Sequence, residues 1–324
     1  MVISFLDLLG FSWLVEYDLE AAYDNLDLFN RIIKTKIIDD KCHPKDSYPA
    51  DMHEFAENTS VTSFSNMISI SDSLIIGSEN ANIFMKQLCN FVSSAFIESN
   101  RYFRKPFNNI KEVKDKYEFI GDTSRERKSC AFPLLFRGGI SIGKLGEIIF
   151  SPELQIINNV AKENGLNVCG IPYLEAIRLE KSGKGPRLFC SQTFVQALDT
   201  ENKKAIKYVE IIKGKKVYEI VWTYYAFEAM ENSSNKMCNI RRCLDQTILP
   251  PAINLYNYFK NDEINNLHYI ELVKLIFIGA IMYYNDNISS DFQIIEILNT
   301  KICDYKLCEK IFDISSLVEQ LKNE

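Results

Sequence analysis

The stretch Val2-Ile3-Ser4-Phe5-Leu6-Asp7-Leu8-Leu9-Gly10-Phe11-Ser12 decides the fold, because it is typical of a buried β-strand that turns at a glycine into a helix. Asp7 lies near the end of its apolar run, and a second apolar run, Met67 to Ile76, carries Asp72. A carboxylate in such a strand is costly to bury and usually has a partner. Two converging carboxylates suit a divalent cation, so the pattern predicts a metal site formed by Asp7 and Asp72.

The composition is that of an ordinary globular protein. The chain has 324 residues, 47% of them hydrophobic, which is compatible with one large domain or with a domain and an appendage. The net charge of -6 shows no basic excess, and the locally basic residues 101–105 and 125–128 are typical of solvated loops. We therefore expect no nucleic-acid partner.

The cysteines and the apolar stretches indicate the compartment. The nine cysteines form no C-x-x-C pair and the chain has only three histidines, so we expect reduced, mostly buried thiols and no structural zinc. The apolar stretch from Ile270 to Tyr284 contains two charges and is shorter than the roughly 20 residues of a membrane span. The N-terminus lacks the pattern of a signal peptide. A cytoplasmic protein without a membrane anchor is predicted.

The periodicity predicts a mixed sheet followed by helices. We expect helices near residues 26–37, 84–95 and 170–180, a loop at 41–65, and either a hairpin or one long strand at 61–76. Further strands are expected at 134–143, with 145–150 as its hairpin partner, and at 187–190, 208–212 and 217–222. These elements predict a sheet domain over residues 1–225 and a helical C-terminal region over residues 226–324.

Four segments, taken in order, resemble the class III nucleotide cyclases. They are FLDLLGFS at residues 5–12, ISDSL at 70–74, RGGISIG at 137–143 and GIPYLEAIRLE at 170–180. The resemblance implies an α+β fold with a ferredoxin-like βαββαβ core and a homodimer. It also implies an enzyme that converts a nucleoside triphosphate to its 3′,5′-cyclic monophosphate and pyrophosphate.

The resemblance carries roles for individual residues. Asp7 and Asp72 match the aspartates that hold two divalent ions, Mg²⁺ or Mn²⁺, and Arg178 matches the arginine that reaches the α-phosphate across the dimer interface. Leu174 stands where the family has an asparagine that orients the ribose. The amides expected to contact the phosphates are those of Leu8, Leu9, Gly10, Phe11 and Ser12.

The resemblance implies that Ile68 and Asn167 are the positions that select the base, and neither purine code of the family is present there. The chain is similar in this respect to the Pycsar anti-phage cyclases, which make cyclic UMP or cyclic CMP for a separate effector. UTP is the favoured substrate and CTP the second choice.

Two other interpretations stay open. The chain is also compatible with a purine cyclase, or with a catalytically silent module that senses nucleotide or holds a partner. Arg137 suits either a surface ion pair or a phosphate contact. Arg178 suits either the catalytic role or an ion pair with Glu175 or Glu180 on its own helix.

Overall fold

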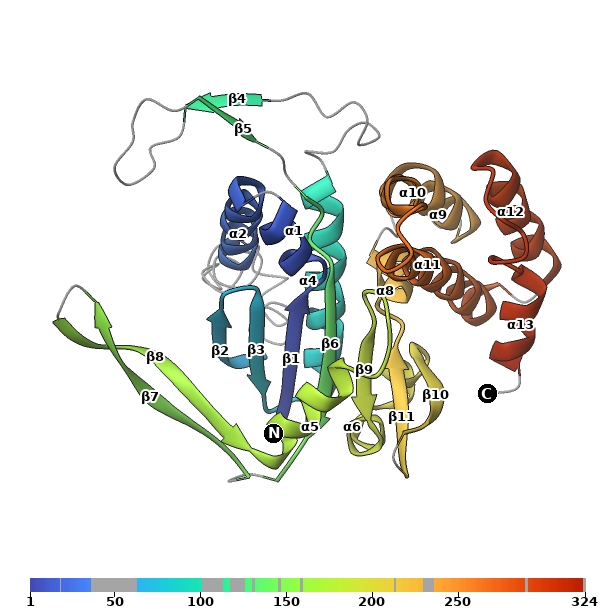
Figure 1. The fold of residues 1–324 in the computed structure, drawn as a ribbon. Helices are drawn as coiled ribbons and strands as arrows, with labels where there is room; N and C mark the ends of the chain where they lie inside the picture. Colours follow the sequence, from blue (N-terminus) through green and yellow to red (C-terminus); the bar gives the residue numbers. More distant parts are fainter. Residues whose placement is uncertain are drawn as a thin grey trace, which may run out of the picture.

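In the computed structural model the chain forms an α+β fold around one mixed sheet (Figure 1). The structure describes residues 1–17, 19–35, 63–100, 113–116, 126–129, 132–144, 147–157, 160–212, 214–229, 236–288 and 291–322. The seven strands lie in the order β10-β11-β9-β6-β1-β3-β2, and only β6 and β9 pair in parallel. Their bounds are Val2–Leu8 (β1), Phe64–Ile70 (β2), Ser73–Ser78 (β3), Phe136–Ile142 (β6), Leu188–Ser191 (β9), Ile206–Ile212 (β10) and Lys215–Ile220 (β11).

The predicted ferredoxin-like core is confirmed by the four strands β2-β3-β1-β6. Helices α1 (Phe11–Tyr17) and α2 (Leu19–Ile33) connect β1 to β2, and helix α4 (Ala81–Ser99) connects β3 to β6. The segment 61–76 is a hairpin rather than one long strand, because its turn at residues 71–72 places β2 beside β3.

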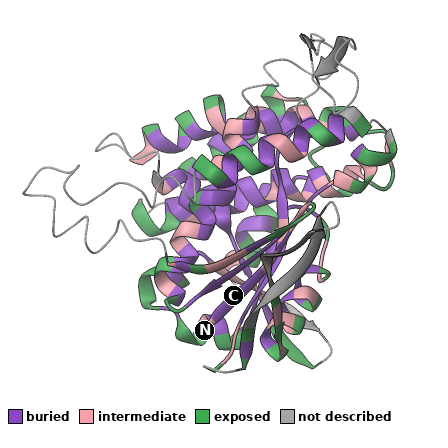
Figure 2. Ribbon diagram, turned by 90° about the vertical axis from the view of Figure 1, so that its left-hand side faces the viewer, coloured by how far each residue is buried: buried purple, intermediate pink, exposed green. Residues whose placement is uncertain are grey.

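The sheet has two different faces because side chains alternate along each strand. From β1, Leu6 packs into the main core with Phe29 of α2 and Phe84 of α4, whereas Ile3 packs on the opposite face with Ile75 and Ala176. Figure 2 shows the buried residues concentrated in the sheet and in the helices that cover it.

Helix α5 (Ile171–Glu180) lies on that opposite face, against β6 and β1. Its backbone comes very close to the strand, because a Cβ atom placed on Gly139 would lie 1.9 Å from the carbonyl oxygen of Ala176. A glycine at this position therefore sets the depth at which α5 packs.

Two smaller hairpins accompany the sheet. One pairs β4 (Val113–Lys116) with β5 (Glu126–Ser129), and the other pairs β7 (Ile148–Ile157) with β8 (Val160–Gly170) and extends away from the main sheet (Figure 1). The prediction that 145–150 pairs with the strand at 134–143 is wrong. Both edges of β6 are taken by β1 and β9, so the described residues 148–150 of this segment pair with β8 instead.

The remaining helices continue the main core. They are α6 (Gln192–Ala197), α7 (Thr200–Lys203), α8 (Trp222–Ala229), α9 (Lys236–Arg242), a π-helix (Cys243–Thr247), α10 (Leu249–Phe259), α11 (Asn266–Asn287), α12 (Asp291–Asp304) and α13 (Ile314–Lys322). Their buried side chains belong to the same hydrophobic cluster as those of β1 and α4. Trp222 begins α8 rather than ending a strand, and α8 crosses residue 225, so the division into 1–225 and 226–324 stays a prediction.

The structure shows where the long apolar stretch and the cysteines lie. Helix α11 has 22 residues and is apolar enough to cross a membrane, but 72% of its apolar window is buried inside the fold, as in a core helix. Among the cysteines that the structure describes, Cys89, Cys190 and Cys243 are buried, whereas Cys169, Cys238, Cys303 and Cys308 are exposed. The expectation of mostly buried thiols is therefore wrong for the described residues. Most of the predicted loop at 41–65 lies outside them.

Candidate active site

Asp7 and Asp72 lie together at one end of the central strands. Asp7 is in β1, opposite Ser73 of β3 on one side and Arg137 of β6 on the other. Asp72 is in the turn between β2 and β3, and its carbonyl accepts a hydrogen bond from the Leu8 amide at 3.0 Å. The neighbouring Ser71 has a φ of 53°, a left-handed conformation that is uncommon for a non-glycine residue. Sheet register and a strained turn thus bring the two carboxylates together.

The Asp7 carboxylate is held by a guanidinium and a hydroxyl. Arg137 donates to Asp7 Oδ2 from Nε at 2.9 Å and from Nη2 at 2.8 Å, and Ser73 Oγ donates to Oδ1 at 3.2 Å. Burial and the charge of Asp7 raise the pKa of Asp72, and Arg137 opposes this increase. The negative charge at this point is therefore only partly neutralised by the chain itself.

This pair of carboxylates fits a divalent cation that shares its ligands with a phosphate substrate. Mg²⁺ is commonly held by one or two carboxylates together with substrate oxygens, and a cation would relieve the repulsion that raises the pKa of Asp72. No cluster of three or more histidine, cysteine or acidic residues suited to a metal is present in the described ranges. With the described residues, Asp7 and Asp72 would hold the ion together with a substrate or water that completes its shell.

Glu180, which ends α5 beside Asp7, is not among the site residues that the sequence predicts. Its side chain is only 2% exposed, and its Oε1 lies 2.6 Å from Arg137 Nε. That oxygen accepts no hydrogen bond from the described residues, because the single Nε hydrogen points to Asp7. Burial raises the pKa of Glu180, and the charge of Arg137 opposes this. Its spacing of four residues from Ala176, on the face that packs on the sheet, is the sequence signal that would have found it.

The predicted amide contacts of the turn after β1 need a correction. The amide of Leu8 donates to Asp72 O and the amide of Leu9 donates to Leu135 O at 2.7 Å, so neither is available to a phosphate. The reason is that Leu8 and Leu9 still belong to the hydrogen-bonded end of the sheet. For Gly10, Phe11 and Ser12, at the start of α1, the contact stays a prediction.

Arg178 is exposed on α5 and does not meet the aspartates within the described chain, where it forms no ion pair with Asp7, Asp72, Glu175 or Glu180. It borders a cavity of about 620 Å³, whose lining residues are Glu175, Arg178, Leu179, Ser182, Ser191, Gln192, Thr193, Gly214, Lys215, Lys216 and Val217. Three of these residues are cationic, which suits an anionic ligand.

Glu175 partly offsets that positive charge. It accepts hydrogen bonds from Ser141 Oγ at 2.6 Å and from Lys215 Nζ at 2.9 Å. Burial works to raise the pKa of Glu175, but these two donors and the charges of Lys215 and Arg178 together lower it. The carboxylate therefore stays ionised and fixes one wall of the cavity.

The positions predicted to select the base and the ribose lie around the same face. Ile68 is 7% exposed and packs with Ile3 and Ile75, so its side chain offers no hydrogen bond. Asn167 of β8 is exposed, and the next residue, Val168, packs on the cluster that contains Ile68. Leu174 is 50% exposed on the first half of α5. The structure thus leaves Leu174 and Asn167 accessible and Ile68 covered.

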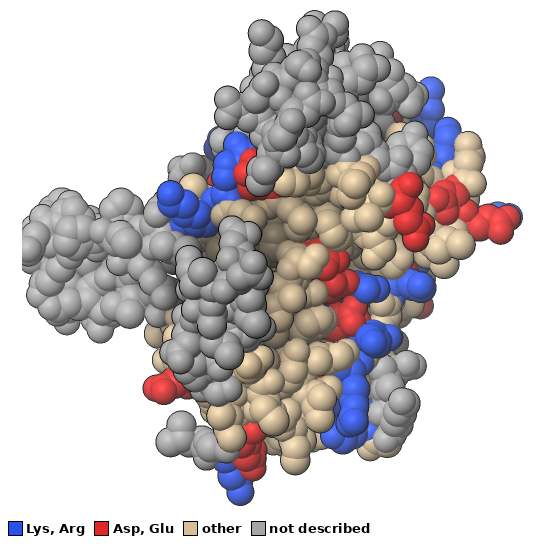
Figure 3. Space-filling view, turned by 60° about the vertical axis from the view of Figure 1, so that its left-hand side comes forward, with Lys and Arg blue, Asp and Glu red and all other residues tan. Residues whose placement is uncertain are grey.

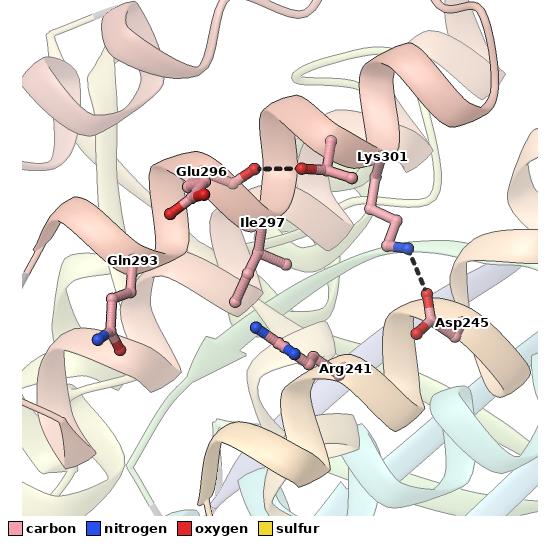
Figure 4. A pocket seen from close by; sticks show the side chains of 7 residues that line it. Arg241, Asp245, Gln293, Glu296, Ile297 and Lys301 are labelled. Carbon is pink, nitrogen blue, oxygen red and sulfur yellow. Dashed lines mark hydrogen bonds and ion pairs between the residues drawn. The ribbon is translucent and has the colours of Figure 1, made fainter.

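A second cavity, of about 420 Å³, lies between α9, the π-helix and α12 (Figure 4). Lys301 Nζ contacts Asp245 Oδ1 at 2.6 Å, and Arg241 and Glu296 also line the space. Its two cations and two carboxylates balance, so the cavity shows no preference for an anion or a cation. On the face of the molecule in Figure 3, acidic and basic side chains of the described residues are likewise interspersed.

Comparisons with known proteins give only a distant likeness. No protein-family model and no curated protein sequence matches the chain. Similar solved structures include an adenylate cyclase from Trypanosoma brucei (12% identity, TM-score 0.39, covering 68% of this chain and 89% of that one). A second is the guanylate cyclase domain of RhGC from Catenaria anguillulae (12% identity, TM-score 0.37, covering 68% of this chain and 94% of that one). A third is the adenylyl cyclase CyaB from P. aeruginosa (15% identity, TM-score 0.35, covering 68% of this chain and 92% of that one). At these values the similarity decides neither the family nor the activity.

Proposed function

We propose that the protein is a metal-dependent nucleotidyl cyclase. The observation that carries this proposal is the convergence of Asp7 and Asp72 at one end of the ferredoxin-like core, on the sheet face that α5 covers. Arg178 on that helix and the cationic cavity beside it provide the positive charge that a triphosphate requires.

The reaction forms a bond from the ribose 3′-oxygen to the α-phosphorus and breaks the bond from that phosphorus to the bridging oxygen. Pyrophosphate leaves, and the hydroxyl proton is released. Two divalent ions, when bound, would lower the pKa of the 3′-hydroxyl and neutralise charge on the phosphates. Asp7 and Asp72 would hold these ions, and the Arg178 guanidinium would stabilise the charge that develops on the α-phosphate.

The site is completed by a second copy of the chain in this proposal. Arg178 is exposed and forms no ion pair with either aspartate in the described part of its own chain. This arrangement suits a residue that acts on the site of the partner subunit. The active form is then a homodimer in which each site takes its aspartates from one subunit and its arginine from the other.

The substrate in this proposal is a pyrimidine nucleoside triphosphate, with UTP favoured and CTP second. The support is the buried, apolar Ile68, which provides neither of the hydrogen-bonding groups that the resemblance associates with purines. The cyclic product would act in the cytoplasm on a separate effector during anti-phage defence, as the resemblance implies.

A catalytically silent nucleotide-sensing module is the second candidate. Two observations favour it: Arg137 already occupies the Asp7 carboxylate, and the apolar Leu174 is exposed where a ribose-binding asparagine is expected. Such a module would bind a nucleoside triphosphate without turning it over.

Complementation between two inactive variants tests the composite site. We expect Asp7→Asn and Arg178→Ala to be inactive when expressed separately. Co-expressed, they should recover roughly a quarter of the wild-type rate, because half of the dimers are mixed and each mixed dimer keeps one intact site. Asp7→Asn co-expressed with Asp72→Ala is the matched control and should stay inactive, because both changes affect the same half of the site. Activity from neither mixture would contradict the composite site.

A further inference from the structure

The guanidinium of Arg137 lies between two carboxylates but is hydrogen-bonded to only one of them. Asp7 Oδ2 accepts both of its hydrogen bonds. Glu180 Oε1 lies closer, at 2.6 Å from Nε, yet accepts no hydrogen bond within the described part of the chain, although the Glu180 side chain is only 2% exposed. A buried carboxylate oxygen without a hydrogen bond is unfavourable, and a small rotation of the guanidinium would satisfy it.

We infer that Glu180 is the second docking position of Arg137: the guanidinium, which pairs with Asp7 here, moves onto Glu180 when a divalent cation takes the Asp7 carboxylate. This inference rests on the proposed function insofar as Asp7 and Asp72 hold metal. Glu180 is then a positioning residue, because it acts through Arg137 and touches neither metal nor substrate.

The charges of the site explain why a second position is needed. A metal ion on the Asp7 carboxylate would meet Arg137 at Oδ2 and Ser73 at Oδ1, and a guanidinium next to a bound cation is repelled. Arg137 lies between Asp7 and Glu180, its Nε within 2.9 Å of an oxygen of each, and its side chain is 34% exposed. Without Glu180, Arg137 would stay on Asp7 and compete with the metal.

The experiment is Mn²⁺ binding to the purified full chain without nucleotide, followed by electron paramagnetic resonance of the free ion. We expect Glu180→Gln to weaken Mn²⁺ binding by roughly 10- to 100-fold, the range seen when a residue that supports a metal ligand is lost. Glu180→Asp keeps the negative charge but shortens the side chain by one methylene. It should weaken binding to a similar extent, because the carboxylate no longer reaches Arg137.

A matched control separates this effect from lost stability. Glu219 is also a buried carboxylate, 1% exposed, paired with Arg187 at a different place in the sheet. Glu219→Gln should lower the melting temperature but leave Mn²⁺ binding within about twofold of the wild type, since additive behaviour is the rule for distant sites.

The outcomes separate the inference from the proposed function. Asp7→Asn should abolish the site, so equal Mn²⁺ binding by Asp7→Asn and the wild type would overturn both the metal site and the inference. If Asp7→Asn loses Mn²⁺ binding while Glu180→Gln binds as the wild type does, the metal site stands and the inference falls. Wild-type binding by Glu180→Asp together with weak binding by Glu180→Gln would also overturn it, because the charge of Glu180 and not its reach would then matter.

Discussion

Replacing Gly139 by alanine should damage catalysis far more than stability. A Cβ atom at this position would lie 1.9 Å from Ala176 O and 2.8 Å from the backbone nitrogen of Glu180. Real contacts of this kind are almost never under 3.0 Å, so α5 must move away from β6 by more than about 1 Å. Both contacted atoms are backbone, which leaves no flexible side chain to absorb the change.

Two magnitudes follow from this displacement. Overpacking of this kind costs about 1 to 3 kcal/mol, which lowers the melting temperature of a 324-residue chain by about 1.5 to 4.5 °C. A misplacement of about 1 Å at a catalytic group costs on the order of 100-fold in rate. Because α5 carries Arg178 and Glu180, we expect Gly139→Ala to fold and to lose on the order of 100-fold in cyclase turnover.

The assay combines thermal unfolding with turnover at saturating substrate and metal. Gly138→Ala is the matched control, since its Cβ would meet Leu6 Cδ2 at 2.5 Å and the backbone oxygen of Phe5 at 2.9 Å, both in β1 and away from α5. It should cost similar stability with much less loss of rate. Gly139→Ala with wild-type turnover, or Gly138→Ala with an equal loss of rate, would refute the reasoning.

Three further predictions concern single side chains. Asp72→Asn should abolish turnover but stabilise the protein without metal at neutral pH, because the raised pKa of Asp72 means that its ionised form is unfavourable in the fold. The gain in the free energy of unfolding should disappear in acid below pH 3.8, where Asp72 is protonated in the folded and the unfolded state. A gain that stays constant across pH in unfolding experiments would contradict this. Arg178→Ala should change the free energy of unfolding by less than about 0.5 kcal/mol but lower turnover by roughly 1,000-fold or more, and a small kinetic effect would remove Arg178 from the mechanism. His268 accepts a hydrogen bond from the Gly185 amide, and burial lowers the pKa of His268 to about 4. Wild-type stability should therefore decline as the pH falls from 6.5 towards 4, and His268→Phe should show less of this decline in a pH titration of unfolding. Identical slopes for the two proteins would contradict a lowered pKa of His268.

The sequence was sufficient for those parts of the fold and site that depend on local pattern. The strand around Asp7 and the helix at 170–180 follow from apolar periodicity and glycine or proline punctuation, whereas the sequence left open a hairpin or one long strand around Asp72. The convergence of the two aspartates was predicted from the need of a carboxylate in an apolar strand for a partner, and this holds for Asp7 in β1. For Asp72 the expected strand position is wrong, because Asp72 lies in the turn between β2 and β3.

Contacts between residues far apart in the sequence could not be predicted from local pattern. The segment 145–150 has strand character, but its partner is decided by which edges of β6 are free, and β9, which takes one of them, lies about 50 residues further along the chain. Arg137 had two open interpretations, and only the register of β1 and β6 places it opposite Asp7. In the sequence Glu180 is an ordinary charged residue at a helix end, and only the packing of α5 on the sheet shows that it is buried.

The most direct test is to incubate the purified protein with ATP, GTP, CTP and UTP in turn, with Mn²⁺ or Mg²⁺, and to identify products by mass spectrometry. The wild type is predicted to release pyrophosphate and a single cyclic pyrimidine nucleotide, cyclic UMP in the first place, and Asp72→Ala none. A purine product would contradict the assignment of the base, and binding of triphosphate with no cyclic product under any condition would contradict the assignment as a cyclase.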